Sequence, residues 1–191
     1  MLRTFKYILC TVLTAVLLVS CGDGVTLQRY YVDNQESKNF ITQDLPISMV
    51  KIDKTDFSEE QHEAFNSVSR LNFLGYSVGD TDVEVYKTEI SKVKTILSAE
   101  KYQDLMEFSD RGRKIVVKYI GDDETADEVV IFGSAQEMGF AIVRILGDEM
   151  NPEKMGRLVY SLQNAQVDEN QIQDIMNFFK EDLIHNNLNV N

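Results

Sequence analysis

Five residues in the first half of the chain, Gly75-Tyr76-Ser77-Val78-Gly79, form its sharpest catalytic pattern. They match the Gly-x-Ser-x-Gly nucleophile elbow, in which a serine on a tight strand-to-helix turn attacks an acyl group. In that elbow the helix follows the serine at once, whereas here Ser77 falls within a strand-like run and the next helix start is predicted at Thr81. The spacing therefore favours a strand residue over a nucleophile at Ser77.

A serine nucleophile also needs a base, and the chain has only two histidines, His62 and His185. His62 precedes Ser77, contrary to the order serine, acid, histidine of that fold, and His185 falls at the polar end of a predicted helix. No His-Gly-Gly segment offers an oxyanion hole. These features disfavour a serine hydrolase, so we predict a non-enzymatic protein with no catalytic residue.

Two acidic clusters raise the question of a cation site: Asp80, Asp82 and Glu84, and the acids of the range 122–128. Calcium takes six to eight oxygen ligands from a shaped loop. In the first cluster Val85 stands where an EF-hand loop has glycine, and the second cluster lacks the EF-hand pattern altogether. A negatively charged helix start and a solvated hairpin loop explain both clusters. The sequence predicts no metal and no cofactor.

Arg144 is a cation within an otherwise apolar strand-like run, 139–146. Both rows of side chains in this run are apolar, so Arg144 is expected either at a sheet edge with a paired acid or in a groove that serves an interaction. Pairing is favoured because buried charges are usually paired.

The periodicity of apolar residues predicts the elements that position these side chains. In the first half it predicts an extended segment over 39–45, a strand over 48–53, a helix from the capping box of Ser58 and Gln61, a strand over 72–78 and a helix from Thr81. In the second half it predicts a three-stranded meander over 114–120, 128–133 and 139–146, a helix capped by Asn151 and a last helix from Asp168.

The last predicted helix carries one apolar stripe, made of Ile172, Ile175, Met176, Phe179 and Leu183. This helix either completes the core or docks onto a partner through apolar residues such as Phe178. Together these elements predict one α+β domain over 39–191. We expect a mixed or mainly antiparallel sheet of about four to five strands, with helices packed on one face.

The segment Leu18-Val19-Ser20-Cys21 ends a short apolar run that follows the basic residues Arg3 and Lys6. A run of this length is too short to span a bilayer, and the combination is typical of a bacterial lipoprotein signal. We therefore expect removal of residues 1–20 and lipidation of Cys21, with 21–38 as the lipidated residue and tether. Within it, Leu27–Val32, with two adjacent tyrosines, is a candidate for packing against the domain. Multiple acyl chains give stable membrane anchoring.

Composition limits the partners of the anchored domain. The formal net charge of −12 falls to −14 when Arg3 and Lys6 leave with the signal, and such a chain repels phosphate backbones. Nucleic-acid binding is therefore not expected. The residues after Cys21 lack an acid-rich surface-export signature, so we expect an outer-membrane anchor with the domain facing the periplasm.

Several segments together resemble the Bacteroidota lipoprotein family with domain of unknown function 4252. The segments are Leu27–Val32, Phe40-Ile41, Leu45–Ser48, Leu71–Leu74, Tyr102–Met106, Glu128–Ile131 and Gly139–Asp148. The resemblance implies a small envelope lipoprotein without established catalytic residues, and family genes often lie beside sigma and anti-sigma factors. By association it implies an accessory role in envelope signalling or stress response.

Two functions follow as hypotheses. The first is a non-enzymatic interaction or regulatory module that contacts an unidentified envelope protein. The alternative is a binding protein for a small apolar or lipid-like ligand held between sheet and helices, in a pocket of roughly 300 to 1,000 Å³.

Overall fold

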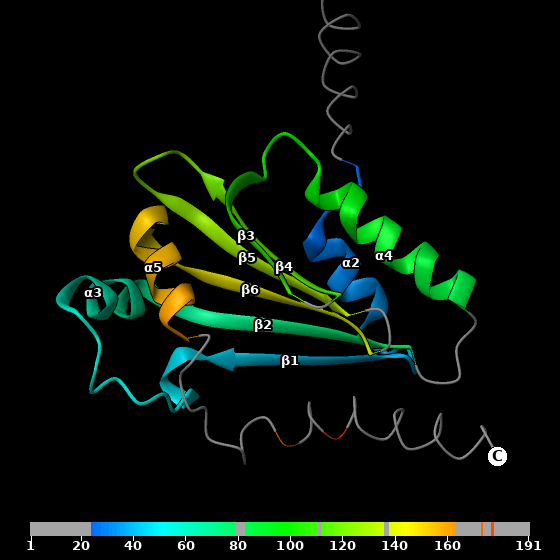
Figure 1. Cartoon of the computed structure of the whole chain (residues 1–191), viewed down its shortest axis with the longest axis horizontal. Coiled ribbons are helices and arrows are strands. Elements are labelled where there is room, and N and C mark those ends of the chain that lie inside the picture. Colours follow the sequence, from blue (N-terminus) through cyan, green and yellow to red (C-terminus); the bar gives the residue numbers. More distant parts are fainter. Residues whose placement is uncertain are drawn as a thin grey trace, which may run out of the picture.

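The computed structural model describes residues 24–78, 83–110, 112–135, 138–162, 173 and 177. Figure 1 shows a long twisted sheet with pairs of helices beside it. Its elements are, in order, α2 (Leu27–Asn34), β1 (Phe40–Pro46), η1 (Ile47–Met49), α3 (Glu59–Ser67), β2 (Val68–Ser77), α4 (Val83–Leu97), β3 (Gln103–Asp110), β4 (Arg113–Gly121), β5 (Ala126–Ala135), β6 (Gly139–Met150) and α5 (Pro152–Leu162). In the part of the chain so described, no helix is long and apolar enough to cross a membrane.

The six strands form one sheet in the order β1-β2-β6-β5-β4-β3. Every neighbouring pair is antiparallel. The predicted α+β class and the C-terminal meander are confirmed, and the meander includes β3 as a fourth strand. The sheet has six strands where the sequence predicted about four to five. The additional strand is β3, in a stretch whose residues Leu105 and Met106 suit either a last helical turn or the start of a strand.

Helices cover both faces of this sheet. Val129 and Val130 are neighbours in β5 and point to opposite faces, and they belong to two separate cores. One core packs under α2 and α4, and the other under α3 and α5 (Figure 1). The expectation that all helices pack on one face is therefore wrong, because both rows of the central strands are apolar and both need cover.

Two helix starts form as their local sequences predict. In the capping box of α3, the Gln61 backbone N–H donates to Ser58 Oγ at 3.3 Å, and the Ser58 N–H donates to Gln61 Oε1 at 2.7 Å. At the start of α5, the Lys154 N–H donates to Asn151 Oδ1 at 3.0 Å. Both caps satisfy backbone groups that have no partner within the helix.

Within the segment 21–38, predicted as lipidated residue and tether, the packing considered for Leu27–Val32 does form, and these residues are part of the helix α2. Thr26 Oγ1 accepts the Arg29 N–H at 3.2 Å and caps α2, whose Leu27 and Tyr30 are buried against the sheet. The described fold therefore begins at α2 and not at Asn39.

The strand predicted over 48–53 is absent from the described structure. The chain turns after Pro46 into the short 3-10 helix η1, where the Val50 N–H donates to the Ile47 carbonyl oxygen at 3.0 Å. Local bonds of this kind satisfy the backbone without a neighbouring strand. Cys21, Thr81 and the predicted last helix with Phe178 lie outside the described residues, apart from Gln173 and Asn177.

Candidate functional site

Ser77 is the last residue of β2 and is 4% exposed. Its hydroxyl donates to the Met138 carbonyl oxygen at 3.5 Å. His62 lies on α3, at the opposite end of β2, so roughly 30 Å of strand separates it from Ser77. His185 lies outside the described residues. Ser77 is thus a buried strand residue and does not occupy the exposed turn that a nucleophile elbow requires.

Asp122, Asp123 and Glu124 lie in a hairpin loop, as predicted, whereas Asp127 and Glu128 belong to β5 and Glu128 is buried. The Asp122 carboxylate accepts the backbone N–H groups of Thr125 at 2.7 Å and Glu124 at 2.9 Å, and these bonds lower the pKa of Asp122. In the first cluster only Glu84 is described, and it pairs with Lys87 at 2.8 Å. Among the described side chains, no group of three His, Cys, Asp or Glu residues could hold a metal ion.

A row of polar residues crosses the sheet on the face that α2 and α4 cover. Cross-strand pairing places Asp44, Asn72, Arg144, Lys118 and Asp104 in one line, interrupted only by Val130 of β5. Within the row, Asn72 Nδ2 donates to Asp44 Oδ1 at 2.9 Å and Lys118 Nζ lies 2.7 Å from Asp104 Oδ1. Lys118 and Asp104 therefore neutralise each other within the row, and the Asp44 carboxylate accepts from the neighbouring Asn72 amide.

Arg144 lies at the centre of this row and is 7% exposed. Its guanidinium donates two hydrogen bonds to the Glu128 carboxylate, from Nε at 2.7 Å and from Nη2 at 2.8 Å, and a third from Nη1 to Gln28 of α2. Burial by itself lowers the pKa of Arg144, but the hydrogen bonds and charge of Glu128 raise it above its ordinary value. The hydrogen bond from Arg144 to Gln28 ties α2 to the sheet.

This geometry decides between the two positions predicted for Arg144. The cation is paired with an acid, as favoured, but it lies on the central strand β6 and not at a sheet edge. Because its side chain is buried, the guanidinium is not available as a surface contact for a partner.

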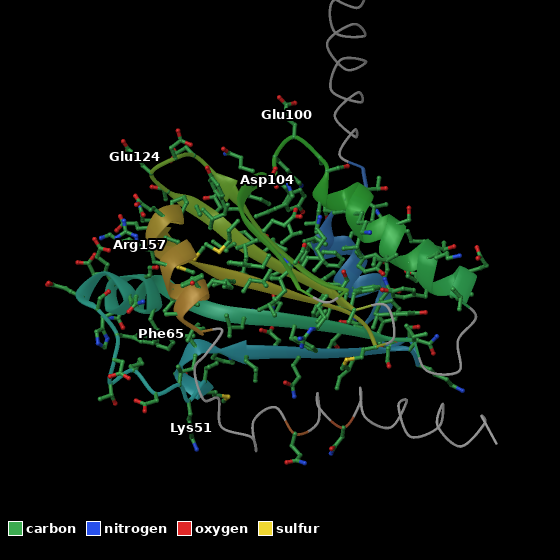
Figure 2. All side chains as sticks on the ribbon, in the orientation of Figure 1. Lys51, Phe65, Glu100, Asp104, Glu124 and Arg157 are labelled. Carbon is green, nitrogen blue, oxygen red and sulfur yellow. The ribbon has the colours of Figure 1, made fainter. Side chains whose placement is uncertain are left out.

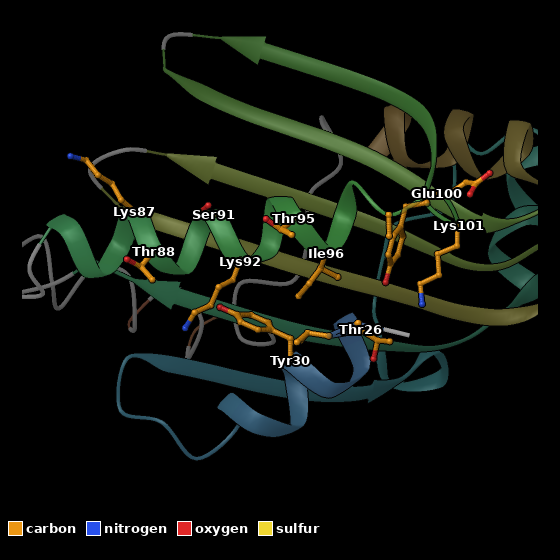
Figure 3. Close-up of a pocket in the computed structure, with 14 residues that line it drawn as sticks. Thr26, Tyr30, Lys87, Thr88, Ser91, Lys92, Thr95, Ile96, Glu100 and Lys101 are labelled. Carbon is orange, nitrogen blue, oxygen red and sulfur yellow. The ribbon is translucent and has the colours of Figure 1, made fainter. Parts of the chain in front are cut away.

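An open groove of about 1150 Å³ lies between the start of α2 and the length of α4, and we call it the anchor groove. Its walls are Gly24 to Thr26, Tyr30, one side of α4, and the loop from Ala99 to Tyr102. Figure 3 shows Tyr30 of α2 beside Lys92 of α4 at one end of the groove, and Thr26 near Lys101 at the other end.

Both apolar and polar side chains line the anchor groove. Val25, Tyr30, Ile96 and Tyr102 supply apolar surface, and the remaining lining side chains are mainly hydroxyls and charges. The charged ones are Lys87, Lys92, Lys101 and Glu100. Such a surface suits an amphipathic ligand, because apolar parts can bury while a polar part meets ammonium and hydroxyl groups.

Tyr30 connects the two helices that form the anchor groove. Its hydroxyl donates to Glu89 Oε2 at 2.8 Å, and Lys92 Nζ lies 2.6 Å from Glu89 Oε1. Burial, followed by the hydrogen bond and charge of Glu89, raises the pKa of Tyr30 above its ordinary value. Neutral Tyr30 therefore holds α2 against α4.

We predict that the free energy of unfolding falls as the pH rises above about 10. The unfolded chain releases the Tyr30 proton there while the folded chain retains it, so up to about 1.4 kcal/mol is lost per pH unit. Urea unfolding at pH 9 and pH 11 measures this fall, and it should be smaller in Tyr30→Phe. The matched Tyr160→Phe, at an exposed tyrosine, should leave the fall unchanged; equal slopes in both variants would contradict the assignment.

The sequence predictions missed the anchor groove. One signal was present, because the polar residues of 87–95 recur at spacings of three and four and so share one side of a helix. The other wall comes from residues about sixty positions earlier, and no local pattern indicates that the two walls meet.

Comparison with known families gives one match. The family described as domain of unknown function DUF4252 matches residues 30–158. No curated protein and no solved structure matches the chain. The matched range extends from Tyr30 of α2, through all six strands, to Leu158 of α5 and covers more than half of the sequence. The chain therefore belongs to the DUF4252 family.

Proposed function

We propose that this chain is a lipid-anchored envelope protein of Bacteroidota that works by binding and not by catalysis. It is held in the outer membrane through Cys21, faces the periplasm, and acts as an interaction or regulatory module in envelope signalling or stress response. The lipoprotein signal that ends at Cys21 supports this location, and the genes that accompany the family support this role. The partner is an envelope protein that meets the domain close to the membrane.

One observation carries this proposal: the anchor groove begins at Gly24, three residues after the proposed lipid attachment site. An extended chain covers at most about 3.6 Å per residue, so the end of the groove at Gly24 lies within roughly 11 Å of Cys21. A partner in the same membrane needs only a short segment to reach it. Tethering both proteins to one surface also raises their effective concentration.

Photocrosslinking in intact envelopes tests the proposal. We expect a photoreactive residue at Ser91, an exposed position in the anchor groove, to give a discrete adduct with one envelope protein. The same residue at the exposed Glu59, on the opposite side of the sheet, should not give that adduct.

A matched pair of serine variants then links the adduct to the groove. Ser91→Trp fills the groove and should weaken the affinity for the crosslinked protein at least tenfold. Ser98→Trp places the same side chain just beyond α4, outside the groove lining, and should bind normally. Equal binding by the two variants, or an identical adduct from Glu59, would contradict the assignment of this surface.

The apolar part of the anchor groove favours a second candidate, a small apolar or lipid-like ligand. Val25, Tyr30, Ile96 and Tyr102 contribute to a groove large enough for such a molecule. Native mass spectrometry and solvent extraction of the protein from envelopes distinguish the candidates. A lipid-like mass present in wild type and absent from Ser91→Trp, without a protein adduct, supports the ligand. A protein adduct without such a mass supports the module.

A further inference from the structure

A second groove lies on the other face of the sheet, beneath α5, and we call it the α5 groove. It has a volume of about 310 Å³ and is lined only by apolar side chains, among them Phe65, Leu71, Ile131, Val143 and Leu162. Leu71, Ile131 and Val143 come from three adjacent strands and are only half-buried. Described elements thus leave part of a central apolar surface incompletely covered.

The charged side of α5 points away from this groove. Arg157 pairs with Glu60 and Glu153, and Lys154 pairs with Glu63, so the ion pairs fix α5 to α3. Figure 2 shows Arg157 on the outer side of α5 and Phe65 below the helices. The inner side of α5 carries Leu158, Val159 and Leu162 into the groove. Any molecule that covers the groove must therefore bring apolar side chains.

The chain continues from the rim of the groove into a segment with this property. Leu162 lines the α5 groove and is the last residue of α5. The following segment, 163–191, carries the stripe of Ile172, Ile175, Met176, Phe179 and Leu183 at spacings of three and four. That spacing puts all five side chains on one face of a helix.

Two described residues agree with this arrangement. Gln173 and Asn177 are helical and exposed, and they lie one turn apart on the polar side of the predicted helix, away from the stripe. The five residues 163–167 can span about 17 Å, which is enough for the segment to turn back over the sheet. The stripe would then face Leu71, Ile131 and Val143.

We propose that the segment 168–183 binds in the α5 groove of its own chain as an amphipathic helix and closes the face of the sheet opposite the anchor groove. The occupant is this segment and not a second copy, because a five-residue link holds it near the groove at an effective concentration of about millimolar. The α5 groove is thereby an intramolecular site, and the anchor groove stays open to partners.

Photocrosslinking within residues 22–191, which contain every described element, tests this proposal. A benzophenone side chain replaces Phe179 on the stripe, and irradiation is followed by peptide mass spectrometry. We expect crosslinks to groove residues such as Leu71, Ile131 and Val143. The same side chain at Asn177, on the polar side, should yield at least tenfold less of these products.

A mixture of ordinary and ¹⁵N-labelled chains identifies which chain supplies the helix. Crosslinked peptides of a single isotope confirm binding in cis. Mixed-isotope peptides show a second copy in the groove, and they overturn the proposal, as do crosslinks confined to the α2 and α4 face or the absence of groove crosslinks.

Charge substitutions give an independent readout. Ile175→Asp combined with Phe179→Asp should lower the thermal midpoint by about 10 °C, because two apolar side chains leave the groove. Gln173→Asp combined with Asn177→Asp adds the same charge on the exposed side and should shift the midpoint by less than about 2 °C. Equal shifts in the two double variants would overturn the proposal even if the chain stays folded.

Discussion

Arg144→Ala is expected to reduce the free energy of unfolding by about 3–5 kcal/mol. The substitution removes both hydrogen bonds to Glu128 and leaves that carboxylate, 8% exposed, without its cationic partner. It also removes the bond to Gln28, so α2 loses its polar tie to the sheet. Chemical denaturation followed by circular dichroism measures the loss.

A double variant separates the charge from the packing. In Arg144→Leu with Glu128→Leu no buried charge remains, so the double variant should recover most of the stability that Arg144→Ala loses. Arg144→Lys should lie between, since an ammonium group cannot reproduce the two-pronged contact. A double variant as unstable as Arg144→Ala would contradict the view that an unpaired Glu128 is the main penalty.

The sequence predicted that Arg144 is paired but could not identify its partner. Glu128 lies on the neighbouring strand β5, two residues from Val130, which pairs with Arg144, so the register between β5 and β6 places the carboxylate diagonally opposite the guanidinium. Strand register depends on the whole sheet, so no local spacing encodes it. The central position of β6 in the sheet could not be predicted for the same reason. It depends on pairing with β2, which is separated from β6 by a long stretch of chain.

Features encoded within a few residues were predicted correctly. The capping box of Ser58 and Gln61 and the Asn151 cap are contacts over three residues, and both formed as expected. Packing of Leu27–Val32 against the domain was considered, but its helical form was not predicted. Only Leu27 and Tyr30 of the eight residues of α2 are buried, so its apolar pattern is weak until the sheet lies beneath it. The anchor groove depends on that docking and was missed for the same reason.

Phe140→Ala is expected to cost about 3–5 kcal/mol of unfolding free energy and to loosen α4. The Phe140 ring stacks on Tyr76 at 5.1 Å between centroids and contacts Tyr86 of α4 at 6.5 Å. Phe40 and Phe132 enclose it at 6.4 and 6.0 Å. Removing this ring leaves a cavity where α4 meets the sheet, since the surrounding strands cannot collapse fully into the space.

Hydrogen exchange of α4 connects this loss to the anchor groove. Amide protection over Val83–Leu97 should fall in Phe140→Ala more than protection over α5, which packs on the other face. Phe140→Leu retains most of the side-chain volume and should lose less than half as much unfolding free energy as Phe140→Ala. Met138→Ala, at an exposed side chain nearby, should change the free energy of unfolding by less than about 0.5 kcal/mol. Equal loss of protection in α4 and α5 would mean that the two cores unfold together, and the anchor groove could not then open without the rest of the domain.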